Sequence, residues 1–270
     1  MQGIRPIRDD EFKKFRQLIY EVAGISMAPQ KKMLVASRLA RRLSHYQLST
    51  YSEYFELANS PQYPGEFQVM IDSLTTNETY FFREPQHFDF LEQTILPQWK
   101  GQQFRIWSAA CSSGEEVYTL AMKLAEFFAH KQWEVVGSDI SSRMLESCRR
   151  AVYPMTRLQH MPDYYLKKYC LKGVREQQGM ILIDRSLRQQ CRFLSLNLME
   201  NLPDIGMFDT IFIRNVMIYF DQDTKKDLIK RITRVLKPGG YLIISHSETL
   251  HGLSDQYKMI KPSIYQRKLT

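Results

Sequence analysis

The chain has 270 residues and a formal net charge of +8, a length that suits one sizeable core with a smaller domain beside it. It has no run of about 18 apolar residues and no apolar signal segment at its start, so we expect a cytoplasmic protein without a membrane span. The four cysteines lack C-x-x-C spacing, which argues against a zinc site or disulfide framework, and we expect no metal. The charge favours an acidic partner: nucleic acid, anionic lipid or an acidic protein surface.

Residues 10–75 read as short helices, the first of which ends where Gly24 breaks the apolar spacing. A second helix, from about Gln30 to Tyr46, lies in a stretch from Val22 to Ser52 that contains neither Asp nor Glu. At about 100° per residue its basic side chains share one sector and its apolar ones the adjoining sector. We interpret the basic sector as a docking surface for an acidic partner, and a solvated face without a partner is the alternative. The basic residues are Lys31, Arg38, Arg41, Arg42 and His45.

The segment SLTTNETYFFRE, residues 73–84, follows neither helical nor strand periodicity. Its aromatic triplet, 80–82, reads as an anchor that is buried against the next domain. Polar residues beside such an anchor suggest a junction with a role in ligand binding. The alternative is a linker in which Asn77 and Thr79 only cap a helix.

A strand, a tight turn and a helix start are predicted over residues 104–125. The run Phe104 to Trp107 is β-prone, the turn Ser108 to Gly114 is built of small residues, and the following apolar residues keep helical spacing. Such a turn lies at the carboxyl end of a strand, where α/β folds bind small molecules. It holds a single glycine and no G-x-G-x-x-G pattern, so the turn by itself predicts a site but not its ligand.

The next predicted strand, Glu134 to Asp139, ends in a carboxylate that lies 25 residues after Gly114, since 139 − 114 = 25. Nucleotide-binding α/β folds place the acid that binds ribose hydroxyls at about this distance, roughly 20 residues on. The alternative is an N-cap, because residues 141–153 are predicted to form the next helix.

The rest of the chain resumes the α/β pattern after an interruption at residues 153–190, which we interpret as a small inserted subdomain with hairpin character. Alternating strands and helices that end in a hairpin predict an α/β fold with a mostly parallel sheet and an antiparallel edge. We expect Asp223 to cap the last helix and Pro238-Gly239-Gly240 to end it. The predicted elements are strands Cys191–Leu196, Phe208–Ile213 and Tyr241–Ser245, helix Thr224–Leu236, and a hairpin of Tyr257–Ile260 with Ser263–Arg267.

Four polar residues are expected at the carboxyl ends of sheet strands: Glu116, Asp139, Asn197 and Asn215. The set suits hydroxyls, amines and a ring edge, as in a nucleoside. The two adjacent glutamates at 115–116 disfavour the binding of a pyrophosphate. A pyrophosphate needs free backbone N–H groups at a helix N-terminus and no competing negative charge. S-adenosylmethionine, a nucleoside that carries a sulfonium, fits better. For Glu116 a capping box with residue 113 is an equally weighted alternative.

At this point the chain closely resembles the chemotaxis receptor methyltransferases, the CheR family. The shared motifs, in order, are SLTTNETYFFRE, WSAACSSGEEVYTLAMKL, GSDIS, SLNLME, FDTIFIRNVMIYFD and LKPGGYLIISHSE. The resemblance implies a Rossmann-like methyltransferase core that depends on S-adenosylmethionine, with a helical N-terminal domain and a small inserted β-subdomain. Its implied boundaries are 1–75 for the helical domain, 76–98 for the junction, and 99–270 for the methyltransferase domain with an insertion at about 155–190. The implied activity is methyl esterification of glutamates on the cytoplasmic helices of chemoreceptors.

The resemblance also implies roles for individual residues. Beyond the resemblance, we expect Arg83 and Tyr219 to position the incoming carboxylate by hydrogen bonding. The alternative is that Arg83 only serves the cofactor carboxylate and Tyr219 only packs. Arg38, Arg41 and Arg42 would meet the acidic receptor, and Met155 to Gln190 would grip a peptide at the receptor's C-terminus. We expect a monomer with no nucleic-acid partner and no direct membrane insertion. The cofactor contacts implied are Asn77, Thr79, Arg83, Glu116, Asp139, Asn197, Leu198, Arg214 and Asn215.

Three rival functions share parts of this pattern. A methyltransferase acting on base amines usually carries a D/N-P-P-Y/F turn after the fourth strand, where this chain has Arg214 to Met217. A non-catalytic sensor that binds receptor and nucleoside would keep the binding residues. A nicotinamide oxidoreductase would need the glycine pattern that the turn after residue 107 lacks.

Overall fold

The computed structural model describes residues 3–128 and 132–269 and divides into two compact units. The smaller unit comprises the residues up to Thr76 together with Tyr219–Thr224. The larger one comprises Asn77–Ile218 and the residues from Lys225 onward. The outermost ends of the predicted domains, at residues 1 and 270, lie outside the described residues.

The smaller unit is a helical domain whose first helix, α1 (Asp9–Ala23), ends at Gly24 in the left-handed conformation. Its helices bury one apolar face each, as their sequence spacing predicts; Phe15, Leu39 and Tyr54 are fully inaccessible to solvent. Thr50 and Glu53 form a capping box at the third helix. The other helices are η1 (Pro29–Lys31), α2 (Lys32–His45), α3 (Tyr51–Ala58) and α4 (Glu66–Leu74).

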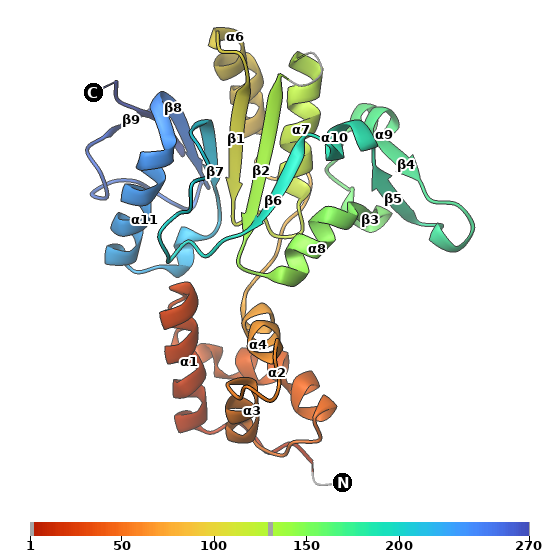
Figure 1. The fold of residues 1–270 in the computed structure, drawn as a ribbon, viewed down its shortest axis with the longest axis vertical. Coiled ribbons are helices and arrows are strands. Elements are labelled where there is room, and N and C mark those ends of the chain that lie inside the picture. The colour runs from red at the N-terminus through yellow and green to blue at the C-terminus, as the bar shows by residue number, and fades with distance from the viewer. Residues whose placement is uncertain (1–2, 129–131, 270) are drawn as a thin grey trace. The chain divides into compact units, whose positions relative to one another are not determined.

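The larger unit is built on a seven-stranded sheet of order β6-β2-β1-β7-β8-β10-β9 (Figure 1). Strand β1 pairs in parallel with β2 on one side and β7 on the other, so that Trp107 lies beside Val136 and Ile211. The terminal hairpin supplies the antiparallel edge, which confirms the predicted fold class. The strands are β1 (Phe104–Ala109), β2 (Trp133–Asp139), β6 (Cys191–Ser195), β7 (Phe208–Ile213), β8 (Leu236–Ile244), β9 (Tyr257–Lys261) and β10 (Ile264–Arg267).

Helices connect the strands of this sheet. Those of the larger unit are α5 (Gln86–Phe90), η2 (Leu91–Ile95), α6 (Leu96–Gln98), α7 (Glu115–Phe127), α8 (Ser142–Arg150), η3 (Met155–Arg157), α9 (Asp163–Tyr169), η4 (Arg175–Gln177) and α10 (Arg185–Arg188). The short η5 (Met217–Tyr219) and the start of α11 (Gln222–Val235) include the segment that groups with the helical domain.

Two details of α11 and β8 differ from the sequence predictions. The carboxylate that accepts the Thr224 N–H is Asp221, at 2.9 Å, so the predicted cap at Asp223 is wrong. Strand β8 begins directly after the helix, at Leu236, and the predicted helix stop at 238–240 lies within the strand. The ladder explains this: the pairing with β7 shifts between Leu236 and Tyr241, so the glycines form an irregularity in the strand.

The predicted insertion is a separate antiparallel sheet of order β3-β5-β4, drawn beside α8 and α9 in Figure 1. Its strands are β3 (Val152–Pro154), β4 (Cys170–Lys172) and β5 (Met180–Ile183). Tyr153 and Ile181 face into the hydrophobic core that also contains residues of β1 and α7. This packing fixes the insertion to the seven-stranded sheet.

No helix within residues 3–128 and 132–269 combines the length and the apolar character that crossing a membrane needs.

Candidate active site

The order in which strands are added to the sheet reverses between β1 and β7. The loops that follow these two strands therefore lie at the edge where open α/β sheets bind ligands. Gly114 ends the loop after β1 with a φ of 96°. A Cβ atom there would lie 2.9 Å from both Cys148 Sγ and the Tyr153 hydroxyl oxygen. Only glycine therefore fits this position, on conformational and on steric grounds.

Non-glycine residues in the left-handed backbone region gather in the segments around this edge. Ala110 and Ser112 have φ of 60° and 50°, and Asn215, after β7, has φ of 58°. Phe82 and Glu84, in the predicted junction, have φ of 58° and 56°. Each such residue costs on the order of 1–3 kcal/mol, and strain of this kind concentrates at functional sites. The backbone geometry thus points to the edge that the sequence pattern also favours.

Glu116, in the first turn of α7, is held by two donors. Ser108 Oγ donates to one carboxylate oxygen at 2.7 Å and Arg214 donates to the other at 2.8 Å. Gly114 is the N-cap of α7, without a side-chain cap. The structure thus shows the Glu116 carboxylate bonded to a side chain of β1 and to the arginine that follows β7. It remains 14% exposed.

Arg214 is the centre of a buried charge network at the end of β7. Its guanidinium group donates to Glu116, to Glu84 at 3.1 Å and to the Arg83 carbonyl, and lies over the ring of Phe88. Its side chain is only 3% exposed, and a buried charge of this kind needs a carboxylate partner. Burial, followed by the charges of Arg214 and His246, lowers the pKa of nearby His87 to about 3.

Asp139 is 6% exposed and organises two loops through its oxygens. One oxygen accepts the Ser112 N–H at 2.8 Å and the other accepts the Ser141 N–H at 2.9 Å. The N-cap of α8 is Ser141, whose hydroxyl oxygen accepts from Met144 N–H, so the capping alternative for Asp139 is wrong. Asp139 thus lies at the carboxyl end of β2 and joins the loop after β1 to the start of α8.

The two adjacent glutamates at the start of α7, Glu115 and Glu116, have separate partners. Glu115 is fully buried and accepts from Ser113 Oγ at 2.6 Å and from Arg157 at 2.8 Å. Glu116 pairs with a different arginine, Arg214, which directly follows β7. Each acid is therefore paired with an arginine, and the inference that the two together repel a pyrophosphate is weaker than the sequence suggested.

The remaining cofactor residues predicted after strands are placed in ordered turns. Asn197 accepts from the Met199 N–H at 3.0 Å, and Arg231 donates to the Leu198 carbonyl at 2.7 Å. The Asn215 N–H donates to Glu248, which also accepts from Ile218 N–H. Burial raises the pKa of the Glu248 carboxyl group even though backbone N–H groups lower it.

The junction residues are tied to the same loops. The carbonyl of Asn77 accepts from Ser112 Oγ at 2.9 Å. Arg83 is half-buried, donates to the Glu78 carbonyl at 2.9 Å and lies over the Tyr80 ring. Thr79 is also half-buried. Tyr219 belongs to the other compact unit, so its predicted role stays a prediction.

The three arginines predicted to dock a partner differ in their surroundings on α2. Arg41 is exposed. Arg38 donates to the Leu74 carbonyl at 2.7 Å, and Arg42 forms an ion pair with buried Glu66. Among the three, Arg41 is therefore the most accessible to a partner, and the docking role stays a prediction.

Several residues of this edge were not singled out from the sequence: Glu84, Arg157 and Glu248. The sequence signal for Glu84 was its place at the end of the junction motif. Arg157 and Glu248 stand in an insertion and in a loop without local pattern, and only the tertiary fold brings them to their partners.

The fold and these side chains together define a class of protein. Carboxylates at the ends of β1 and β2, on a sheet with this order, suit the ammonium and ribose of S-adenosylmethionine, and the chemistry of the donor set fits that group. The chain is an α/β methyltransferase.

Comparisons with known proteins give the family. Residues 77–266 match the CheR methyltransferase SAM binding domain, and residues 10–75 match the CheR methyltransferase all-alpha domain. The chain belongs to the CheR methyltransferase family. The expected dependence on S-adenosylmethionine and the expected chemotaxis methyltransferase activity are confirmed.

The chain is similar to curated proteins over nearly its full length. It is 38% identical to a chemotaxis protein methyltransferase of Escherichia coli (strain K12) over 262 residues, which cover 96% of this chain and 91% of that protein. It is 36% identical to one from Borreliella burgdorferi over 97% of this chain and 95% of that protein. Among solved structures, a SAM-dependent methyltransferase from Methanosarcina mazei matches with a TM-score of 0.34 and 19% identity, covering 56% of each chain.

Proposed function

We propose that this protein transfers the methyl group of S-adenosylmethionine to glutamate carboxylates on the cytoplasmic helices of chemoreceptors, and that it does so in the cytoplasm. The observation that carries the proposal is the Glu116–Arg214–Glu84 network at the carboxyl edge of the sheet, with Asp139 on the neighbouring strand. Membership of the CheR family supports the receptor as substrate.

Glu116 and Asp139 take the binding roles in this proposal. Glu116 accepts from the ammonium group of the methionine portion, for which its exposed part is available. Asp139 accepts from ribose hydroxyls, because it stands at the carboxyl end of β2, where open α/β folds place the acid that binds a ribose. Asn77, Thr79, Asn197, Leu198 and Asn215 complete the binding set. Arg214 keeps Glu116 in place.

The cofactor supplies an electrophilic methyl group on a sulfonium. A glutamate carboxylate is already ionised at pH 7, because its ordinary pKa is about 4.3, and no general base is required of the protein. The residues of the site must hold the two reactants in line and exclude water, for which effective molarities reach roughly 10⁵ M or more. We assign the alignment of the carboxylate to Arg83 and Tyr219.

Transfer of radiolabelled methyl groups to a receptor tests this assignment. Arg83→Ala and Tyr219→Phe should each lower turnover while leaving the far-ultraviolet circular dichroism unchanged. Unchanged turnover in both variants would contradict the assignment of Arg83 and Tyr219 to carboxylate alignment. Calorimetric titrations with S-adenosylhomocysteine and with NADH separate the enzyme classes, since we expect only the former to bind.

We further propose that the inserted subdomain binds an extended peptide at the receptor's C-terminus. Strand β4 is an edge strand, and the exposed apolar side chains Leu171 and Val174 lie in and after it, with exposed fractions of 56% and 73%. Edge strands with unpaired backbone groups accept added strands, and neighbouring apolar side chains give specificity.

A pull-down with receptor tail peptide tests the second proposal. Leu171→Asp should abolish capture. Met259→Asp is the matched control, because Met259 is 61% exposed on β9, which forms the edge of the other sheet. Equal capture by both variants would refute peptide binding at β4.

A further inference from the structure

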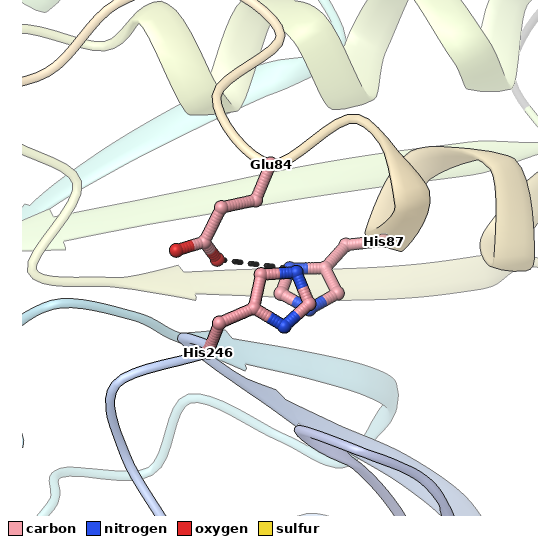
Figure 2. A group of neighbouring side chains, drawn as sticks. All are labelled: Glu84, His87 and His246. Carbon is pink, nitrogen blue, oxygen red and sulfur yellow. Dashed lines mark ion pairs between the residues drawn. The ribbon is translucent and has the colours of Figure 1, made fainter.

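Glu84, His87 and His246 converge at one point of the larger unit (Figure 2). One ligand-type atom of each residue lies within 4.8 Å of those of the other two. Glu84 lies in the loop before α5, His87 lies in α5, and His246 follows β8. The fold thus brings together residues that are far apart in the sequence. The expectation of no metal rested on cysteine spacing, which carries no information about a cluster of glutamate and histidine.

A single hydroxyl group fixes which imidazole nitrogens carry lone pairs. Ser263 Oγ lies 2.7 Å from His87 Nε2 and 3.2 Å from His246 Nδ1. With its own proton directed to the Pro262 carbonyl oxygen, 2.5 Å away, it can accept from both rings. His87 Nδ1 and His246 Nε2 are therefore the atoms left without a proton.

The lone pair of His87 Nδ1 has no hydrogen-bond partner among the described residues, although the His87 ring is fully buried. It faces a Glu84 carboxylate oxygen at 3.3 Å. Two acceptors at this separation repel each other unless a proton or a metal cation lies between them. Buried polar atoms are almost always satisfied, so this pair calls for a ligand.

The separation matches a tetrahedral zinc site. Zn²⁺ binds imidazole nitrogen and carboxylate oxygen at about 2.0–2.2 Å, which places two tetrahedral ligands about 3.4 Å apart. Two histidines and a glutamate with one open position are a known donor set for zinc. The shared serine would hold both rings in the ligating tautomer, as outer-sphere partners do in metal sites.

We propose that Glu84, His87 and His246 form a binding site for Zn²⁺ at the carboxyl edge of the sheet. His246 is exposed, so its ring can adjust to close the coordination. Arg214 donates to the same Glu84 oxygen that faces His87, and a bound ion must compete with this guanidinium group. The site is therefore expected to be weaker than a structural zinc site.

Cobalt titration of the tag-free full chain tests the site, with Co²⁺ as the visible probe for zinc geometry. We expect one Co²⁺ per chain with tetrahedral ligand-field absorption that added Zn²⁺ removes. His246→Ala should raise the dissociation constant at least tenfold, as loss of metal-site residues does. His251→Ala, the matched control, replaces another exposed histidine of the same loop and should bind like the wild type.

Two results would overturn the proposal. One is equal Co²⁺ binding by the wild type and by His246→Ala, and the other is wild-type binding without tetrahedral absorption. Because His246 is exposed, its variant is expected to fold, which a thermal unfolding curve checks. The measurement involves neither receptor nor cofactor, so its failure would leave the methyltransferase proposal intact.

Discussion

Both units contain a network of buried charged side chains, one around Glu66 and one around Arg214, and the two networks differ in what surrounds them. In the helical domain Glu66 is 4% exposed and accepts from Arg42 at 2.5 and 2.8 Å, from Tyr46 at 3.0 Å and from Tyr54 at 2.8 Å. In the larger unit Arg214 donates to two carboxylates whose side chains are 14% and 19% exposed.

The difference separates a structural network from one suited to a ligand. All donors to Glu66 come from helices of the same domain, and its acceptor capacity is filled. The partners of Arg214 keep exposed oxygen surface, beside loops with left-handed residues. A saturated buried charge stabilises the fold, whereas a partly saturated one at a sheet edge can exchange a protein contact for a cofactor contact.

The largest effect should come from breaking the structural network. Glu66→Gln leaves the Arg42 guanidinium group without its counter-charge, and loss of one partner of a buried pair costs about 3 kcal/mol or more. We expect that decrease in the free energy of unfolding from urea titration, with unchanged affinity for S-adenosylhomocysteine. Glu56→Gln, an exposed carboxylate of α3, should change stability by less than about 0.5 kcal/mol. Equal effects of the two substitutions would contradict the account.

The second-largest effect, a loss of methyl transfer, is expected from a change in the Arg214 network. Arg214→Lys keeps the charge but loses the fork that holds Glu84 and Glu116 together. Losing a charge-assisted hydrogen bond costs about 2 kcal/mol, so we expect methyl transfer to fall roughly 30-fold at 1.36 kcal/mol per factor of ten. Arg105→Lys is the control, because Arg105 pairs with Glu134 near the amino ends of β1 and β2. A comparable loss of activity in both variants would argue for a general structural effect.

Acid should weaken the structural network specifically. Burial raises the pKa of Glu66, but hydrogen bonds from Arg42, Tyr54 and Tyr46 outweigh it and hold the pKa below the ordinary 4.5. A lowered pKa means that the stabilisation is complete above pH 4.5 and is lost as pH falls through the lower folded-state value. Unfolding curves between pH 6 and pH 3 should therefore converge for wild type and Glu66→Gln. A constant difference across that range would contradict the assignment.

The smallest effect is expected on the exposed face of α2. Arg41→Ala removes a surface charge, and such charges contribute about 0.2–1 kcal/mol per contact. Receptor binding should weaken two- to five-fold at low salt, and the difference should vanish at high salt. Lys13→Ala, which removes an exposed charge of α1 instead, serves as the control. Equal weakening by both would show a non-specific charge effect.

The fold could be predicted because the strands are marked by composition and periodicity. Phe208–Ile213 is an apolar run that forms β7 with the predicted bounds. In the terminal hairpin, Pro262 marks the turn between the two strands. The prediction of the helix cap failed where two nearby residues could each cap the same helix. Asp221 and Asp223 both precede α11, and the geometry of the turn, which the sequence does not encode locally, selects Asp221.

The positions of the candidate site residues in the fold could be predicted from the sequence, but their hydrogen-bond partners could not. Glu116 and Asp139 follow from their places after strands, whereas the pairing of Glu116 with Arg214 depends on the β1–β7 contact. The same holds for Arg42, whose helical spacing put it on the basic sector although Glu66 neutralises it. Charge patterns on one helix give no information about carboxylates that other helices bring in.

The most direct test of the account is calorimetric titration of S-adenosylhomocysteine into the wild type, Asp139→Asn and Glu66→Gln. We predict that Asp139→Asn weakens binding at least tenfold, because one charged acceptor for ribose is lost, while Glu66→Gln binds like the wild type. Thermal unfolding confirms that each variant is folded at the titration temperature. Wild-type affinity in Asp139→Asn would contradict the claim that this edge of the sheet binds the cofactor.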